Sequence, residues 1–207
     1  VGFTVAGPKR FLASGHPAGG DDELRVEGQP LLLGVIESTD AGENWRPLSL
    51  LGQTNFAALA AAHDRVYGFS AADGRFMVRR VRRWVTRSQI ALHSFAVDPG
   101  DPDHIVGAAA RGVVESVDGG RTWNPIDSPE LVLLTWQGGG GLWGADEGGK
   151  IHRSFDGGSS WERAGELPGE PEALLAGADA LYAAVRDKGI FRSSDKGRTW
   201  KLRPGQH

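Results

Sequence analysis

The sequence contains no cysteine, which excludes disulfides, thiolate metal sites and cysteine nucleophiles. It has no run of about 18 apolar residues, so no helix of this chain is predicted to span a membrane. Neither charge sign dominates, because a formal net charge of −3 gives no general attraction to nucleic acid or to a lipid surface. The sequence also has no nucleotide-binding, metalloprotease or serine-hydrolase motif in a context that would support that function.

Glycine is abundant, with 31 residues, and together with 11 prolines it is spread along the whole chain. This distribution is typical of a turn-dense all-β protein. Five tryptophans recur at intervals of 39, 39, 38 and 39 residues, at Trp45, Trp84, Trp123, Trp161 and Trp200. A fixed period of this length indicates a repeat architecture.

Four of these tryptophans close the same local pattern, in which a serine is followed two residues later by an aspartate and then by a glycine. The copies occupy residues 38–45, 116–123, 154–161 and 193–200. A fifth copy, ending at Trp84, is degenerate, since Arg79 stands at the aspartate position and Val81 at the glycine position.

Each repeat contains four short segments with strand character. In the third repeat these are residues 92–97, 104–108, 113–116 and a segment that begins near Thr122. A unit of this size cannot bury its own apolar face, so neighbouring units must stack around shared cores. We therefore predict a single domain, residues 1–207, of five four-stranded units: approximately 1–51, 52–88, 89–128, 129–167 and 168–207.

A glycine precedes the third strand of every repeat, where the turn is expected to need a positive φ. These glycines are Gly34, Gly74, Gly112, Gly149 and Gly189.

The repeated pattern resembles the Asp-box, or BNR repeat, of sialidases and many other β-propellers. This resemblance implies an all-β fold, a β-propeller of about five four-stranded blades with Asp-box hairpins. Residues 2–8 and 11–17 look like a group of bacterial Asp-box proteins that are labelled exo-α-sialidases or glycosyl hydrolases. That likeness implies an exported protein of the extracellular space or cell envelope.

The aspartate of each hairpin is predicted to be structural. The Asp118 carboxylate can accept hydrogen bonds from the backbone of the following turn, and the Trp123 ring can pack against the adjacent blade. The alternative, catalytic carboxylates or calcium ligands, is disfavoured because copies spaced around a ring cannot converge on one substrate. The residues assigned this structural role are Asp40, Trp45, Asp118, Trp123, Asp156, Trp161, Asp195 and Trp200.

Ligands of proteins with this fold usually bind at the central channel, on the loops between blades and between second and third strands. The first repeat inserts a long polar loop, residues 15–30, at the second of these positions. The alternative for each polar residue on this face is an ordinary solvated rim. The binding candidates are His16, Asp21, Asp22, Arg25, His93, Arg111, Asp146, Glu172 and Arg186.

No metal site and no cofactor are predicted. His16 with Asp21 and Asp22 is the only local group of metal-ligating residue types, and it follows no ligand-spacing motif.

Sialidases use an arginine triad, a tyrosine nucleophile and an Arg-Ile-Pro signature, and the resemblance does not extend to these. The signature is absent, and the two tyrosines, Tyr67 and Tyr182, occupy a second-strand core position. The main prediction is therefore a non-catalytic binding or scaffold protein that engages a protein or glycan through the channel face and the long loop. The alternative is a glycoside hydrolase acting on a small or acidic glycan through Asp146, Glu147 or Glu172.

A third hypothesis concerns the degenerate repeat, which carries Arg79, Arg80, Arg82, Arg83 and Arg87. Such a cluster can bind an anionic ligand. The competing interpretation, which we favour from sequence, is a solvated hairpin whose arginine stems cover apolar surface, because no interleaved aromatic residues accompany them. Nucleic acid is accordingly not expected as a partner.

Overall fold

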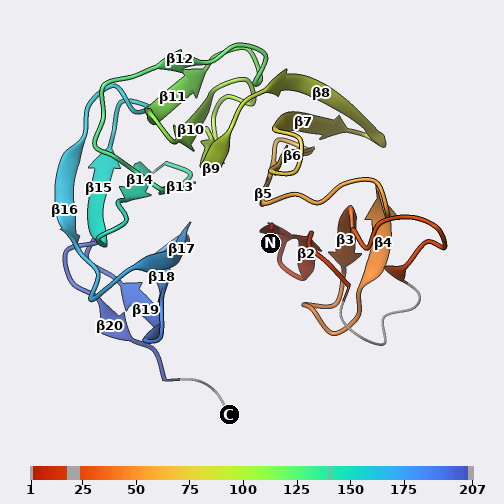
Figure 1. Ribbon diagram of the computed structural model, residues 1–207. Helices are drawn as coiled ribbons and strands as arrows, with labels where there is room; N and C mark the ends of the chain where they lie inside the picture. Colours follow the sequence, from red (N-terminus) through yellow and green to blue (C-terminus); the bar gives the residue numbers. More distant parts are fainter. Residues whose placement is uncertain (1, 18–23, 140, 205–207) are drawn as a thin grey trace. The chain divides into compact units, whose positions relative to one another are not determined.

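The computed structural model of the chain describes residues 2–17, 24–139 and 141–204. It contains twenty strands in five four-stranded antiparallel sheets, each following the order of the chain (Figure 1). The sheets are the blades of a β-propeller arrangement, which confirms the predicted fold class. The described residues form no helix long and apolar enough to cross a membrane.

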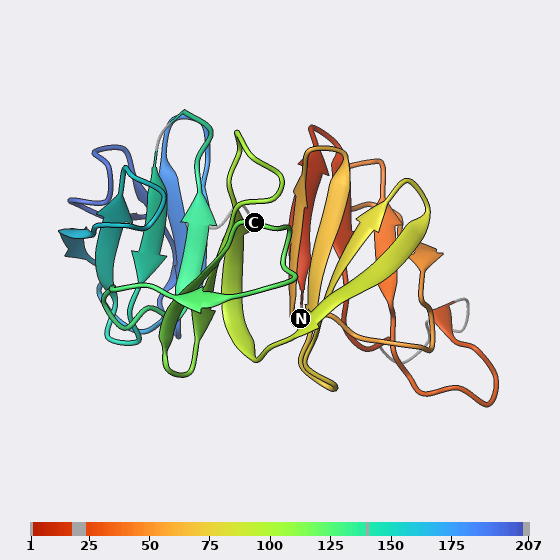
Figure 2. The same cartoon turned by 90° about the horizontal axis from the view of Figure 1, so that it is seen from above.

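The chain divides into two compact units, Val1–Leu92 and His93–His207. The prediction of a single domain over residues 1–207 stays a prediction. The first unit holds two sheets, and the second holds three (Figure 2).

The strands of the first unit lie in two consecutive sheets. The first sheet consists of β1 (Phe3–Gly7), β2 (Arg10–Ala13), β3 (Val35–Ser38) and β4 (Arg46–Ser49). The second consists of β5 (Ala58–Ala62), β6 (Arg65–Ser70), β7 (Arg75–Arg80) and β8 (Arg83–Gln89).

The strands of the second unit lie in three sheets. The third sheet consists of β9 (Leu92–Val97), β10 (Ile105–Ala109), β11 (Gly112–Ser116) and β12 (Asn124–Pro125). The fourth consists of β13 (Leu133–Trp136), β14 (Leu142–Ala145), β15 (Lys150–Ser154) and β16 (Glu162–Glu166). The fifth consists of β17 (Pro171–Ala176), β18 (Leu181–Val185), β19 (Gly189–Ser193) and β20 (Lys201–Leu202).

Apolar side chains from neighbouring sheets meet in shared cores. In the first unit, Leu12 and Val35 of the first sheet pack with Phe56, Val66 and Met77. Two further cores in the second unit join the third sheet to the fourth and the fourth to the fifth. Three of the second strands, β6, β10 and β14, are buried along almost their whole length because both of their faces are covered.

The five glycines before the third strands all have a positive φ, between 57° at Gly34 and 112° at Gly112, as the sequence predicted. Gly34 also has no room for a side chain, because an added Cβ would lie 2.3 Å from the Ser49 carbonyl oxygen. The turn into β3 therefore needs glycine both for its positive φ and because there is no room for a Cβ.

The four hairpins with the serine–aspartate pattern share one hydrogen-bond arrangement. In the hairpin between β11 and β12, Asp118 Oδ1 accepts from the Thr122 backbone N–H (2.9 Å), and Asp118 Oδ2 accepts from the Thr122 hydroxyl (2.7 Å). The Ser116 hydroxyl donates to Asp118 Oδ1 (2.8 Å) and accepts from the Gly120 N–H (2.8 Å). The Trp123 indole N–H donates back to the Gly120 carbonyl (3.2 Å).

The degenerate repeat forms a different turn. Here the strand pairing of β7 and β8 continues to the tip, where Arg80 pairs with Arg83 and only Val81 and Arg82 make the turn. With no glycine at its position, Val81 has a φ of 60°, which is strained for a β-branched residue. The Trp84 indole donates to the Ser49 hydroxyl of the first sheet (2.9 Å) instead of to its own hairpin.

Candidate functional site

The described binding candidates of the first unit, His16 and Arg25, are exposed loop residues. His16 Nδ1 is 3.4 Å from the Asn55 side-chain nitrogen, and Arg25 is exposed. Asp21 and Asp22 lie outside the described residues.

Among the candidates of the second unit, the structure brings two together. Arg186 Nε donates to Glu172 Oε1 (3.2 Å), and Arg186 Nη1 donates to Glu170 Oε2 (2.6 Å). The hydrogen bond to Glu172 and the charge of Glu170 raise the pKa of Arg186. This exposed ion-pair group joins the β17 and β18 ends of the fifth sheet.

The remaining candidates of the second unit have separate places. Asp146 closes its own turn, since its carboxylate accepts from the Lys150 backbone N–H (2.8 Å) and lies 3.9 Å from Lys150 Nζ. His93 is exposed on β9, and Arg111 is exposed at the turn before β11. No contact between these three residues and the Arg186 group is found in the described part of the second unit.

A polar cluster in the third sheet was not predicted from sequence. The His104 ring lies between two carboxylates, with Nδ1 3.1 Å from Asp98 Oδ2 and Nε2 2.8 Å from Glu115 Oε1. Its edge meets the Trp136 ring of the fourth sheet at 5.1 Å. The described residues contain no group of three or more histidines, aspartates and glutamates arranged to hold a metal ion.

In the first unit, charged side chains gather around a buried glutamate. Glu37 lies on β3, has a side-chain exposure of 6%, and faces the second sheet together with its strand neighbours Leu12 and Arg46. Arg10 Nε donates to Glu37 Oε1 (2.7 Å), and Arg46 Nη2 donates to Glu37 Oε2 (2.9 Å). Burial raises the pKa of Glu37, but the two arginine hydrogen bonds outweigh it and the net pKa is lowered. Glu37 is therefore ionised at neutral pH.

Arg79 approaches this ion-pair group from the second sheet. It is paired with Val66 on one side and Trp84 on the other, so it shares the face that packs against the first sheet. Its Nε is buried and has no hydrogen-bond partner among the described residues. Burial, and then the positive charge of Arg10, lower the pKa of Arg79, while Glu37 opposes this effect.

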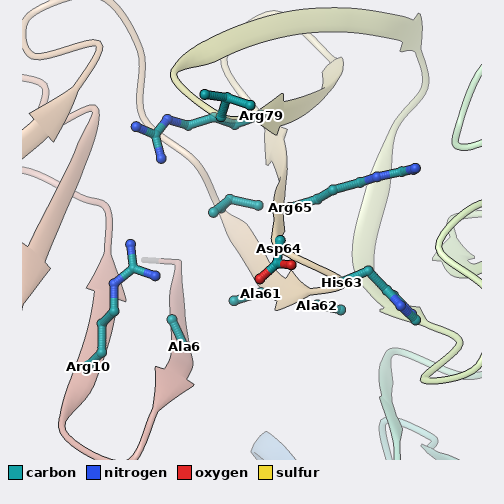
Figure 3. A pocket seen from close by; sticks show the side chains of 10 residues that line it. Ala6, Arg10, Ala61, Ala62, His63, Asp64, Arg65 and Arg79 are labelled. Atoms are coloured by element: carbon teal, nitrogen blue, oxygen red, sulfur yellow. The ribbon is translucent and has the colours of Figure 1, made fainter.

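A cleft of about 360 Å³ opens between the two sheets at this point. Figure 3 shows the Arg10 and Arg79 guanidinium groups at the same end of the cleft, directed toward one another from the first and second sheets, while Arg65 extends away. The turn His63–Asp64 forms another part of the wall; both residues have a positive φ, as a two-residue hairpin turn requires. The arrangement is suited to holding a negatively charged group.

The sequence identified the arginines of the β7–β8 hairpin as a possible anion-binding cluster. It did not point to Arg10, Glu37 or Arg46. One signal was present, because Glu37 is the only charged residue in a fully buried four-residue strand, β3. A buried carboxylate needs a charged partner, yet the sequence alone does not say which arginines supply it.

No protein-family model matches the chain. Over 114 residues it is 32% identical to the photosystem II assembly lipoprotein Ycf48 of Synechococcus sp. (strain CC9902), an alignment that covers 49% of this chain and 34% of that protein. The chain therefore matches about a third of the length of this curated relative.

Solved β-propeller structures resemble the chain over nearly its whole length. A Ycf48 bound to D1 peptide has a TM-score of 0.58 at 18% identity, covering 97% of this chain and 65% of that one. A protein in a nidogen–laminin complex has a TM-score of 0.72 at 10% identity, covering 98% and 80%. A GH74 xyloglucanase from Xanthomonas campestris has a TM-score of 0.59 at 20% identity, covering 99% and 32%. At these identities the likeness shows the fold alone.

Proposed function

We propose that this chain is an exported Asp-box β-propeller that binds a protein partner without catalysing a reaction. The observation that carries the proposal is the 32% identity to a lipoprotein named for its role in photosystem II assembly. A solved Ycf48 holds a D1 peptide, which makes a peptide segment a reasonable form of ligand for this chain. The cell-envelope location rests on the lipoprotein relative and on the resemblance of the first repeat to exported proteins.

The local structure around the proposed catalytic carboxylates also favours binding over hydrolysis. Glycoside hydrolysis needs one carboxyl group able to donate a proton and a second able to act as base or nucleophile. Glu172 is hydrogen-bonded to Arg186, and Asp146 is bonded within its own turn, so neither carboxylate is free to act on a substrate. Tyr67, the residue type that sialidases use as nucleophile, is fully buried.

A panel of fluorogenic glycosides, including a sialoside and a xyloglucan oligosaccharide, tests the absence of catalysis with the purified 207-residue chain. We expect no turnover above the buffer rate. Turnover that disappears in Glu172→Gln or Asp146→Asn would establish the glycoside hydrolase alternative and overturn the proposal.

Selection from a displayed library of random peptides tests the binding activity. We expect a consensus whose synthetic peptide binds with a Kd in the micromolar range, roughly −8 kcal/mol. Deletion of residues 18–28 combined with Arg111→Gln and Arg186→Gln should weaken this binding if it uses the predicted face. Failure to enrich any consensus would contradict the proposed peptide ligand.

A further inference from the structure

The cleft between the first and second sheets has an excess of positive charge. Its lining includes three arginines, Arg10, Arg65 and Arg79, and one carboxylate, Asp64. Arg10 is paired in turn with the buried Glu37, which also binds Arg46. Both oxygens of Glu37 already accept hydrogen bonds, Oε1 from Arg10 and Oε2 from Arg46. The charge of Glu37 attracts Arg79, whose buried Nε has no hydrogen-bond partner among the described residues.

The position of Arg79 is determined by packing. Its cross-strand partner Trp84 stacks on Phe56, with ring centroids 4.9 Å apart, and is anchored through the Ser49 hydroxyl. Because cross-strand partners share a face, Arg79 is held against the first sheet, with its Nε buried. Turning the side chain outward would remove its stem from this apolar contact.

Arg10 is held as firmly on the opposite wall. Its Nε is fixed by Glu37, which leaves the Nη side of the guanidinium for another acceptor. Two guanidinium groups that converge on one cleft repel each other when alone and gain from an oxyanion placed between them. The cleft volume of about 360 Å³ accommodates such a group with room for a substituent.

Asp64, in the β5–β6 turn of the second sheet, adds a negative charge to the lining of the cleft (Figure 3). A carboxylate repels sulfate, which carries no proton at neutral pH. It accepts a hydrogen bond from hydrogen phosphate or from a monoanionic phosphate ester, each of which has a P–OH group. Arg65, also on this wall, extends away from the two converging guanidinium groups.

We propose that this cleft is a binding site for a phosphate group that carries a proton, held by Arg10 and Arg79 with Asp64 accepting from the P–OH. The site is separate from the loops on which the predicted binding residues lie, and it does not depend on the proposed peptide-binding function. Free inorganic phosphate and a phosphate ester on a larger ligand share this chemistry.

Calorimetric titration of the 207-residue chain with sodium phosphate at pH 7, with ionic strength held constant by sodium chloride, tests the site. We expect saturable binding with a Kd below about 1 mM. Arg79→Gln should weaken it at least about tenfold, because a hydrogen bond between two charged groups is lost. Arg80→Gln is the matched control, since Arg80 is exposed on the opposite face of the same hairpin and should leave the Kd within about twofold.

Selectivity tests the role of Asp64. The intact protein should bind sulfate at least about tenfold more weakly than phosphate, and Asp64→Asn should reduce this preference by weakening phosphate and strengthening sulfate. Asparagine tolerates the positive φ of this position, so the turn is expected to remain folded. O-phosphoserine and phosphate, both titrated at about pH 5.5 where each carries a P–OH group, distinguish the sources: tighter binding of the ester indicates an ester ligand, and weaker binding indicates the free ion.

Absence of saturable phosphate binding would overturn the proposal. Equal losses in Arg79→Gln and Arg80→Gln would also overturn it, because they would show diffuse attraction to a basic hairpin. Tryptophan fluorescence of each variant confirms folding, since Trp84 is anchored beside the site.

Discussion

At the scale of single residues, Glu37 is the charge on which the first unit depends most. Its side chain is 6% exposed, whereas its partners Arg10 and Arg46 are 45% and 69% exposed. If the carboxylate were removed, the two arginines could partly move into water, and this limits the loss of stability. The other residues of β3 carry no charge, so nothing else in this strand can replace the carboxylate.

We predict that Glu37→Gln lowers the free energy of unfolding by about 2 kcal/mol, below the range for a fully buried pair because both arginines are half exposed. Urea unfolding followed by tryptophan fluorescence measures the change. Glu166→Gln is the control, because Glu166 pairs with Arg163 where both side chains are more than half exposed, and it should cost less than about 0.5 kcal/mol. Equal costs for the two variants would contradict the role of burial.

At the scale of elements, the chain uses two kinds of hairpin for one position in the repeat. Four hairpins are held by an aspartate that binds its own turn, as Asp118 does with Thr122. The fifth, between β7 and β8, is held by strand pairing up to its tip and by Trp84 across to the first sheet. In this repeat Arg79 stands at the aspartate position and lines the cleft between the two sheets of the first unit.

The aspartate hairpins predict a loss of stability in acid. Hydrogen bonds from the Ser160 side chain and then its backbone lower the pKa of Asp156 from 3.8 to about 2. The pKa of Asp40 is also lowered to about 2, chiefly by the Asn44 backbone and side chain. A lowered folded-state pKa stabilises the fold above pH 3.8, and this contribution is lost as the pH falls toward 2.

We expect the free energy of unfolding to decrease steeply between about pH 4 and pH 2, with about one extra proton bound by the unfolded chain for each such aspartate. Asp156→Asn removes one of these protons and should reduce the slope of unfolding free energy against pH. Ser160→Ala, which removes the largest cause of the shift, should give an intermediate slope. An unchanged slope in Asp156→Asn, measured by urea unfolding across this range, would refute the assignment.

At the scale of the whole molecule, stability comes from cores that lie between sheets. Leu142 of the fourth sheet is fully buried and packs with Val106 and Val113 of the third. Trp161, which closes a hairpin of the fourth sheet, packs against the same core. Neighbouring sheets within a unit should therefore lose structure together.

We predict that Leu142→Ala lowers the free energy of unfolding by about 3 kcal/mol, through lost burial and the cavity left behind. Hydrogen exchange should show reduced protection of β10 in the third sheet as well as of β14 in the fourth. Leu175→Ala, at a position 52% exposed, should change stability by less than about 0.5 kcal/mol. Loss of protection confined to β14 would argue against a shared core.

The sequence by itself determined the period, the five four-stranded sheets and the positive φ of glycines such as Gly34, because these depend on local turns and on short apolar strands. Among the described binding candidates of the second unit, Glu172 and Arg186 lie together, since a carboxylate on one strand and an arginine at the end of its neighbour meet readily. Only the tertiary structure brought Arg10, with its partner Glu37, and Arg79 to one cleft lined by both arginines. Their approach depends on the packing of one sheet against the next, and no spacing along the chain encodes that contact.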